Sequence, residues 1–417
     1  MVAAKIEGSS QSILWLPVVG LAVVQGSIAL TWVIYNLYLV DLLTQLGFAS
    51  ALAAVVLGVE NILGIVMEPL MGSLADRRQR WLGSRFPLIA IGILLSAFVF
   101  VLIPMVVVIA LRVPPDLLAG SLLAGVRWLL PIFLVAWALS MTVFRSPALS
   151  LLGRYAFGSG LPQAASILTL VGGLAGALGP MAGGWILERG PWLAFGLGSA
   201  VLVVAALVLR SVDPGMGVEE EEATSRPSGS LSWAGLGCVF GAGVGIALGF
   251  RLMMTLLPVV LQEQGPDAPV GLIMGMIFVA LAVTAIPSGA LARQIGNPLA
   301  MVLGLGLMGS LLGSLLWIQS PGLSIAAVAG LGAAFSLVSN GTIPFALSMV
   351  PPTRAGLGTG IFFSGGAAAS SVFGILFRSP DAISTQVGLI IGVIAFLSAG
   401  FWVALSQQLK GENPVLG

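Results

Sequence analysis

The stretch ENILGIVMEPLMGSLADRRQRWLGSRFPLI, residues 60–89, sets the pattern for the whole chain. It begins inside an apolar segment that runs from 51 to 74, passes through an arginine-rich stretch around Asp76, and enters a second apolar segment at 87–111. Each apolar segment has the length that an α-helix needs to cross ~30 Å of hydrocarbon, about 20 residues. The stretch therefore predicts two membrane-spanning helices joined by a charged loop.

The composition of the whole chain agrees with this interpretation. Of 417 residues, 58% are hydrophobic and only 8% are charged, and the mean hydropathy is +1.08. A soluble globular domain carries about 25% charged residues. Most of the surface of this chain must therefore face lipid. The 56 glycines, which follow no repeating period, are typical of transmembrane helices that pack closely.

Several kinds of chemistry are excluded by the residues that the chain lacks. There is no histidine, so no imidazole serves as a metal ligand, proton switch or catalytic base. The single cysteine, Cys238, forms no intrachain disulfide or metal-binding cysteine cluster. A net charge of +1 attracts no nucleic acid, and no GxxxxGK[ST] motif for nucleotide binding occurs. We expect a protein that is not an enzyme and holds no cofactor or metal.

Charge-free segments of spanning length occur twelve times, six on each side of a polar stretch. We predict an all-α, polytopic membrane protein with two pseudo-symmetric six-helix bundles at 1–209 and 232–417. Residues 210–231, with the acidic run 219–222, form a flexible linker or, alternatively, a regulatory acidic patch. The first span is too long for the apolar part of a cleaved signal sequence. The spans are predicted at 13–40, 51–74, 87–111, 128–150, 164–187, 191–209, 232–260, 269–292, 297–318, 323–350, 355–377 and 383–408.

Two pairs of similar segments support the division into halves. GSLADRRQ at 72–79 ends the second span, and GALARQIG at 289–296 ends the eighth. SPALSLLGR at 146–154 ends the fourth, and IPFALSMVPPTR at 343–354 ends the tenth. Parallel halves related by an axis along the membrane normal, with a solute site between them, are the architecture of a rocking transporter.

The distribution of basic residues predicts the orientation. If the amino terminus is cytoplasmic, eleven Lys and Arg residues lie on that side, and only Arg112, Arg127, Arg189 and Arg378 lie on the other. Lys and Arg are enriched in cytoplasmic loops. We therefore expect both termini and the linker in the cytoplasm. We place the protein in the plasma (inner) membrane and expect it to function as a monomer.

The loop within residues 60–89 resembles that of a known family. Gly72, Asp76 and Arg77 resemble the cytoplasmic loop signature of the major facilitator superfamily. Gly83 and Arg85, followed by a proline, are similar to the loop of glycoside, pentoside and hexuronide cation symporters and of sucrose transporters.

Two further matches point to the same branch. Glu68 and Pro69 are similar to the acidic residue and proline of melibiose-type carriers, and 342–348 with the glycines of 356–360 resembles the tenth-helix end of sucrose transporters. The resemblance implies a secondary transporter for a sugar or glycoside, coupled to H⁺ or another cation.

Ionisable groups inside the spans are the first candidates for function, because they are costly in lipid unless paired or hydrated. Glu60, about 15 Å into the second span, and its neighbour Asn61 are candidates for solute contact or proton binding. Glu68 and Arg145 are expected at similar depth as a structural ion pair, with a coupling role as the alternative. Arg251 either binds a solute oxygen or carboxylate or extends to the outer interface.

Uncharged polar residues add a second group of candidates. Gln25, Trp32 and Asn36 fall on one face of the first span, near Tyr35, where an aromatic ring beside amides suits a sugar. The same residues also suit helix packing and interfacial belts. Asn340 in the tenth span either contacts the solute or bridges helices.

The charged loop itself is a candidate gate. Asp76, just past the predicted helix end, has Arg77, Arg78 and Arg80 beside it and can pair with them or with the opposite half. Breaking such pairs in each transport cycle would make the interface bistable. The alternative is that the arginines only orient the protein.

Two other functions remain open at this stage. GPMAGGW at 179–185 resembles the fifth-helix signature of facilitator drug exporters, which favours export of lipophilic compounds, although helix packing selects the same small residues. A non-transporting membrane assembly factor with the same fold is the other alternative. For a transporter, the partners are a small-molecule solute, a coupling ion and the lipid bilayer.

Overall fold

The computed structural model describes residues 13–112, 120–214, 231–376 and 383–412. Twelve helices in this part of the chain are long and apolar enough to cross a membrane, which confirms the predicted twelve spans. The first six are α1 (Trp15–Gln45), α2 (Ala51–Leu82), α3 (Phe86–Arg112), α4 (Gly120–Leu149), α6 (Leu161–Glu188) and α7 (Pro191–Val212). The last six are α9 (Trp233–Gln264), α10 (Val270–Ile295), α11 (Asn297–Ser314), α12 (Pro321–Ser348), α13 (Ala355–Leu376) and α14 (Thr385–Glu412).

Three short helices complete the described elements. They are α5 (Leu152–Tyr155) and the 3₁₀ helix η1 (Gly158–Gly160) between α4 and α6, and the 3₁₀ helix η3 (Pro352–Arg354) before α13. The helix α7 continues through Val212, into the start of the predicted linker. The acidic run 219–222 and most of that linker lie outside the described residues.

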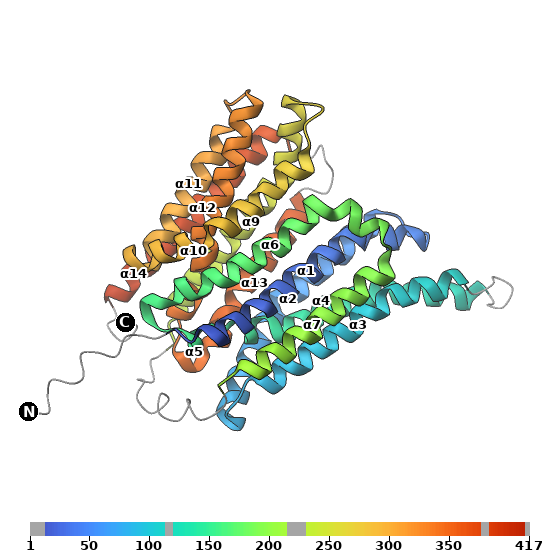
Figure 1. The fold of residues 1–417 in the computed structure, drawn as a ribbon, viewed down its shortest axis with the longest axis horizontal. Coiled ribbons are helices and arrows are strands. Elements are labelled where there is room, and N and C mark those ends of the chain that lie inside the picture. Colours follow the sequence, from blue (N-terminus) through green and yellow to red (C-terminus); the bar gives the residue numbers. More distant parts are fainter. Residues whose placement is uncertain (1–12, 113–119, 215–230, 377–382, 413–417) are drawn as a thin grey trace, which may run out of the picture.

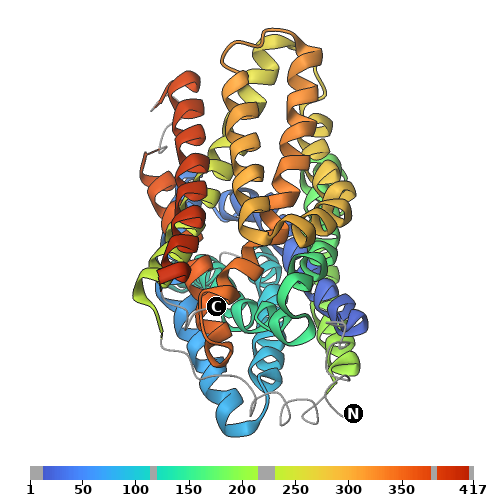
Figure 2. The same cartoon turned by 90° about the vertical axis from the view of Figure 1, so that its left-hand side faces the viewer.

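The helices form two bundles that lie side by side, one from α1 to α7 and one from α9 to α14 (Figures 1 and 2). Each bundle has its own apolar core. The first core contains residues of the first six spans together with Ile343, and the second contains residues of the last six. The predicted architecture of two six-helix bundles is thus what the chain adopts.

The helix α2 is longer than the sequence predicts. It was expected to end at 74, with Asp76 in a loop, but it continues to Leu82. Arginine, glutamine and leucine are good helix formers, and the first residue that stops the helix is Gly83. Gly83 has φ +68° and donates its N–H to the carbonyl of Gln79, as a left-handed helix cap does. Asp76 and the arginines beside it therefore lie on a rigid helix.

The two bundles meet along two helix pairs, α2 with α13 and α6 with α10. Glycines allow the backbones to approach closely at both. A Cβ atom on Gly72 would lie 2.0 Å from the carbonyl oxygen of Gly356, and one on Gly271 would lie 2.8 Å from that of Pro180. The interface is therefore built from helix backbones in direct contact, and it positions the charged groups of α2.

Candidate functional site

Three carboxylates on α2 are the charged groups buried closest to the interface between the bundles. Glu60, Glu68 and Asp76 are 7%, 0% and 3% exposed, respectively. A buried carboxylate is stable only when it is paired, hydrogen-bonded or protonated. The partners of the three groups differ, and these differences define the candidate site.

Glu60 lies near the middle of the membrane-spanning region and interacts with both bundles. The hydroxyl of Tyr35 on α1 donates a hydrogen bond to its carboxylate. Arg251 on α9 interacts with it electrostatically across the interface, although the two side chains are not in ion-pair contact in the described structure. Arg251 donates from Nε to Ser370 Oγ of α13 at 2.9 Å, which is its one hydrogen bond among the described residues. Arg251 is therefore held inside the protein and does not extend to the outer interface.

The ring of Tyr35 packs within an aromatic cluster. It stacks on the ring of Trp137 with centroids 4.6 Å apart, and Trp32 meets Tyr35 edge to face at 5.5 Å. The indole N–H groups of Trp32 and Trp137 are buried and have no hydrogen-bond partner in the described structure. Aromatic faces beside a carboxylate and an arginine can hold a polar organic molecule that has both apolar and hydrogen-bonding surfaces.

Glu68 is satisfied mainly within its own bundle. Arg145 and Ser146 of α4 both donate hydrogen bonds to its carboxylate, so the structure brings Glu68 and Arg145 together as an ion pair. The guanidinium of Arg145 also lies 4.5 Å from the ring centroid of Phe363 on α13. Thr359 of α13 donates to the carbonyl of Ser146 at 3.0 Å. The pair thus sits where the two bundles touch.

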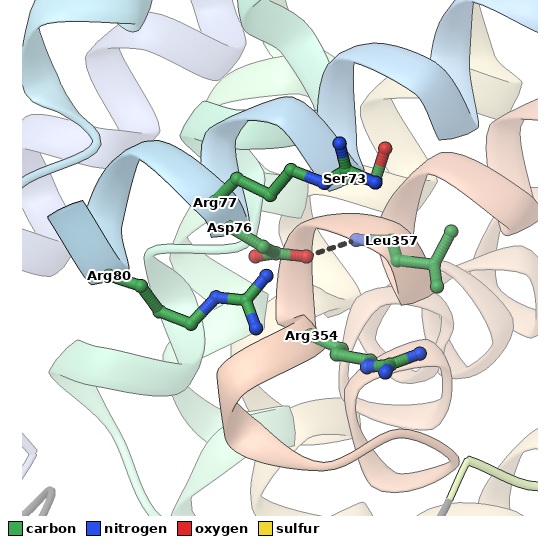
Figure 3. Close-up of a pocket in the computed structure, with 6 residues that line it drawn as sticks. All are labelled: Ser73, Asp76, Arg77, Arg80, Arg354 and Leu357. Carbon is green, nitrogen blue, oxygen red and sulfur yellow. Dashed lines mark hydrogen bonds between the residues drawn. The ribbon is translucent and has the colours of Figure 1, made fainter.

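Asp76 binds the opposite bundle through the start of α13. It accepts hydrogen bonds from the backbone N–H groups of Gly356 and Leu357, both at 2.9 Å. Figure 3 shows the bond from Leu357. The first N–H groups of a helix have no partner inside it and favour a negative charge. Arg85 completes the set, because its guanidinium donates to Asp76 at 2.7 Å and to Ser150 at 3.0 Å.

The arginines next to Asp76 in sequence are not its partners in the described structure. Arg77 and Arg80 line a cavity of about 130 Å³ together with Ser73, Leu357 and Arg354 of η3. Arg85, not one of the arginines adjacent to Asp76, is its ion-pair partner. The sequence signal for this pairing was Gly83. It ends α2 and reverses the chain, so that Arg85 comes back beside the end of α2.

The remaining candidates are dispersed. Asn36 and Asn61 each donate to a carbonyl of their own helix, at 2.7 Å. Gln25 packs against Gly172 of α6, and its Oε1 is buried without a partner in the described structure. Asn340 is fully buried and donates to the carbonyl of Ala285 at 2.8 Å, so it bridges α12 and α10. The structure brings Glu60 and Trp32 to Tyr35, with Arg251 near Glu60, and leaves Gln25 and Asn340 outside this group.

Comparison with known proteins assigns the family. The family model of the Major Facilitator Superfamily matches residues 21–375, which is most of the chain. The chain belongs to this superfamily. The family and the twelve apolar helices point to an integral, multi-pass membrane protein of the transporter class. A search of the curated proteins finds no match to this sequence.

Solved structures with the same fold transport different solutes. A bacterial homologue of the iron transporter ferroportin, in an outward-facing state with soaked iron, is 16% identical; the match covers 95% of this chain and 99% of that one, with a TM-score of 0.73. The human organic anion transporter MFSD10 (TETRAN) is 16% identical, with 93% and 98% covered and a TM-score of 0.63. The proton:xylose symporter XylE bound to 6-bromo-6-deoxy-D-glucose is 12% identical, with 96% of each chain covered and a TM-score of 0.65. At these identities the likeness establishes the fold alone.

Proposed function

We propose that this protein is a secondary active transporter that moves a small polar organic solute, of the sugar or glycoside class, by alternating access. We further propose that transport is coupled to H⁺ or another cation through Glu60. One observation carries the proposal. The carboxylate of Glu60 is nearly buried at mid-membrane and faces Arg251 of the other bundle without being paired to it.

The side chains of Glu60 and Arg251, which belong to different bundles, support a solute site between the bundles. Arg251 keeps the terminal nitrogens of its guanidinium free of hydrogen bonds to described residues. A planar guanidinium binds hydroxyl or carboxylate oxygens with more than one donor. Trp32, the partly exposed member of the aromatic cluster, supplies an apolar ring of the kind that packs against a sugar.

Protonation of Glu60 gives a route for coupling. While Glu60 is ionised, its charge attracts Arg251 and the hydroxyl of Tyr35. A proton removes that charge and releases Arg251 to bind the solute. With no histidine in the chain, carboxyl groups are the side chains best suited to carry this proton. Solute binding and proton binding would then favour each other, as coupled transport requires.

The contacts between the bundles support a gate that is closed on the side where Asp76 lies. The hydrogen bonds of Asp76 to α13 and of Thr359 to α4 both lie toward that side of the interface. The bias of basic residues favours a cytoplasmic location for this side. We therefore propose a cytoplasmic gate that is closed in this structure, in a protein that acts as a monomer in the plasma (inner) membrane with both termini cytoplasmic.

The proposal is tested by accumulation in proteoliposomes under an imposed proton or sodium gradient, with a panel of radiolabelled sugars and glycosides. Glu60→Gln should abolish gradient-driven accumulation while downhill exchange continues, because the solute site keeps its shape but loses the titratable group. Glu263→Gln, an exposed carboxylate at the end of α9, is the matched control and should accumulate solute like the wild type. Unchanged accumulation by Glu60→Gln would refute the assignment of Glu60.

Export of lipophilic compounds finds no added support in the motif that suggested it. Within GPMAGGW, Gly179 and Gly183 face Val33 and Leu37 of α1, and Pro180 faces Gly271 of α10. These positions are small because neighbouring helices pack on them. Resistance to amphipathic compounds on overproduction would nevertheless favour the exporter. Transport of any solute by the purified chain would exclude the assembly factor.

A further inference from the structure

The cavity beside Asp76 brings together three arginines from both bundles. Arg77 and Arg80 come from α2 and Arg354 from η3, and their side chains surround the cavity together with Ser73 and Leu357 (Figure 3). The ion pairs in the described part of the chain use other arginines, namely Arg85, Arg145 and Arg154. Among the described residues, the three guanidinium groups at the cavity therefore have no ion-pair partner of their own.

Asp76, the one acidic residue among the described residues that line this cavity, does not neutralise them. Its carboxylate is already bound to Arg85 at 2.7 Å and to two backbone N–H groups of α13. The cavity thus presents an excess of positive charge. Guanidinium groups bind phosphate oxygens in pairs of short, charge-assisted hydrogen bonds. A phosphate group is the ligand chemistry that fits this arrangement.

The surface of α2 next to the cavity indicates where that phosphate comes from. Leu70, Leu74, Arg77 and Trp81 follow at helical spacing and share one face of α2. The three apolar side chains on this face are 50%, 38% and 87% exposed, respectively, which indicates a lipid-facing surface. Exposed tryptophans mark the headgroup level of a bilayer. A phospholipid whose acyl chain runs along the two leucines would place its phosphate at Arg77.

We propose that the headgroup phosphate of an anionic phospholipid binds between Arg77, Arg80 and Arg354 and stabilises the closed gate. Two of the arginines move with one bundle and the third moves with the other. The lipid therefore makes its full set of contacts only while the gate is closed, and it shifts the population toward that state. This inference rests on the gate described under the proposed function, but lipid binding is measurable without any transport.

The test measures the gate and the lipid together. Spin labels are placed on Ser211 of α7 and Gln408 of α14, two exposed positions at the end of the molecule where Asp76 lies, after Cys238 is replaced by serine. The purified protein is reconstituted in phosphatidylcholine vesicles with and without phosphatidylglycerol, and the distribution of label distances is recorded. Phosphatidylglycerol should increase the short-distance, closed population in the wild-type background.

The arginine variants separate a specific site from general surface charge. Arg77→Gln and Arg354→Gln should each weaken the lipid effect about fivefold, the change expected for one basic residue near an anionic bilayer. Arg78→Gln removes the same charge from an exposed position of α2 that does not line the cavity, and it should keep the full effect.

Three results would overturn the proposal. The first is an equal loss of the lipid effect in all three variants, which would show that the lipid acts only through the surface potential. The second is no loss in Arg77→Gln or Arg354→Gln. The third is closure of the gate by inorganic phosphate in phosphatidylcholine vesicles, which would replace the lipid with a soluble anion. Lipid-dependent closure without solute accumulation would refute the transport proposal and leave the lipid site standing.

Discussion

Glu60 and Asp76 lie on the same helix and are almost equally buried, yet the protein satisfies them in different ways. Asp76 has three hydrogen bonds, two of them from the backbone of the opposite bundle. Glu60 has one, from Tyr35 of its own bundle, and its neighbour across the interface stays out of ion-pair contact. A fully bound carboxylate holds two surfaces together. A partly bound one keeps the capacity to take up a proton or a ligand.

Glu68 lies between Glu60 and Asp76 along α2, and its ion pair with Arg145 should affect the stability of the fold. Arg145→Met should lower the free energy of unfolding by about 3–5 kcal/mol, because it leaves a fully buried carboxylate without its cation. Arg251→Met should lower the free energy of unfolding much less, because Glu60 keeps its hydrogen bond to Tyr35 and was not ion-paired. Unfolding of the two variants in detergent, followed by circular dichroism, measures both effects. Equal losses would contradict the distinction between a paired and an unpaired carboxylate.

Close packing at the Asp76 end of the interface provides the next test. Gly72→Ala would place a Cβ atom 2.0 Å from the carbonyl oxygen of Gly356, so the gate should not close without a shift of the backbone. Overpacking of this kind costs about 1–3 kcal/mol. The labels on Ser211 and Gln408 should then report mainly the long, open-gate distance.

Gly58→Ala is the matched control for this change. It lies on the same helix at the level of Glu60, and a Cβ atom there would meet nothing within 4 Å. The distance distribution should stay like that of the wild type. A short-distance population that survives in Gly72→Ala would show that the contact between α2 and α13 does not control closure.

The sequence was sufficient for the spans and for the buried charges because both depend on local properties. Apolar length identifies a helix in a bilayer, and a lone carboxylate such as Glu60 is conspicuous against so few charges. The partners could not be assigned in the same way. Ser370 reaches Arg251 over 119 positions of sequence, and the N–H of Gly356 reaches Asp76 over 280. The first contact depends on how α9 and α13 pack within one bundle and the second on how the two bundles dock, and no periodicity within one helix encodes either.

Of the two kinds of partner expected for Asp76, the adjacent arginines and the opposite half, the structure shows the second. Arg77, Arg78 and Arg80 are the nearest cations along the chain, but on a continuous helix adjacent residues point in different directions. Asp76 turns toward α13, and Arg85 reaches it only because the chain reverses at Gly83. The residue at which α2 ends therefore had to be known before the ion pair of Arg85 and Asp76 could be predicted. Arg77 and Arg80, which do not pair with Asp76, line the cavity.

The smallest effect is expected from Asp76→Asn. The amide keeps one oxygen that can accept from Gly356 or Leu357, but it loses the charge that favours Arg85 and the start of α13. A loss of about 1.4 kcal/mol would slow solute exchange about tenfold, because return to the closed gate becomes less favourable. Solute binding, measured separately by equilibrium titration, should be unchanged, since Glu60 and Arg251 are untouched. Asp267→Asn, at an exposed position after α9, should alter neither quantity. If Asp76→Asn weakened binding as much as exchange, Asp76 and Glu60 would belong to one site, and the division of α2 into a gate and a solute site would fail.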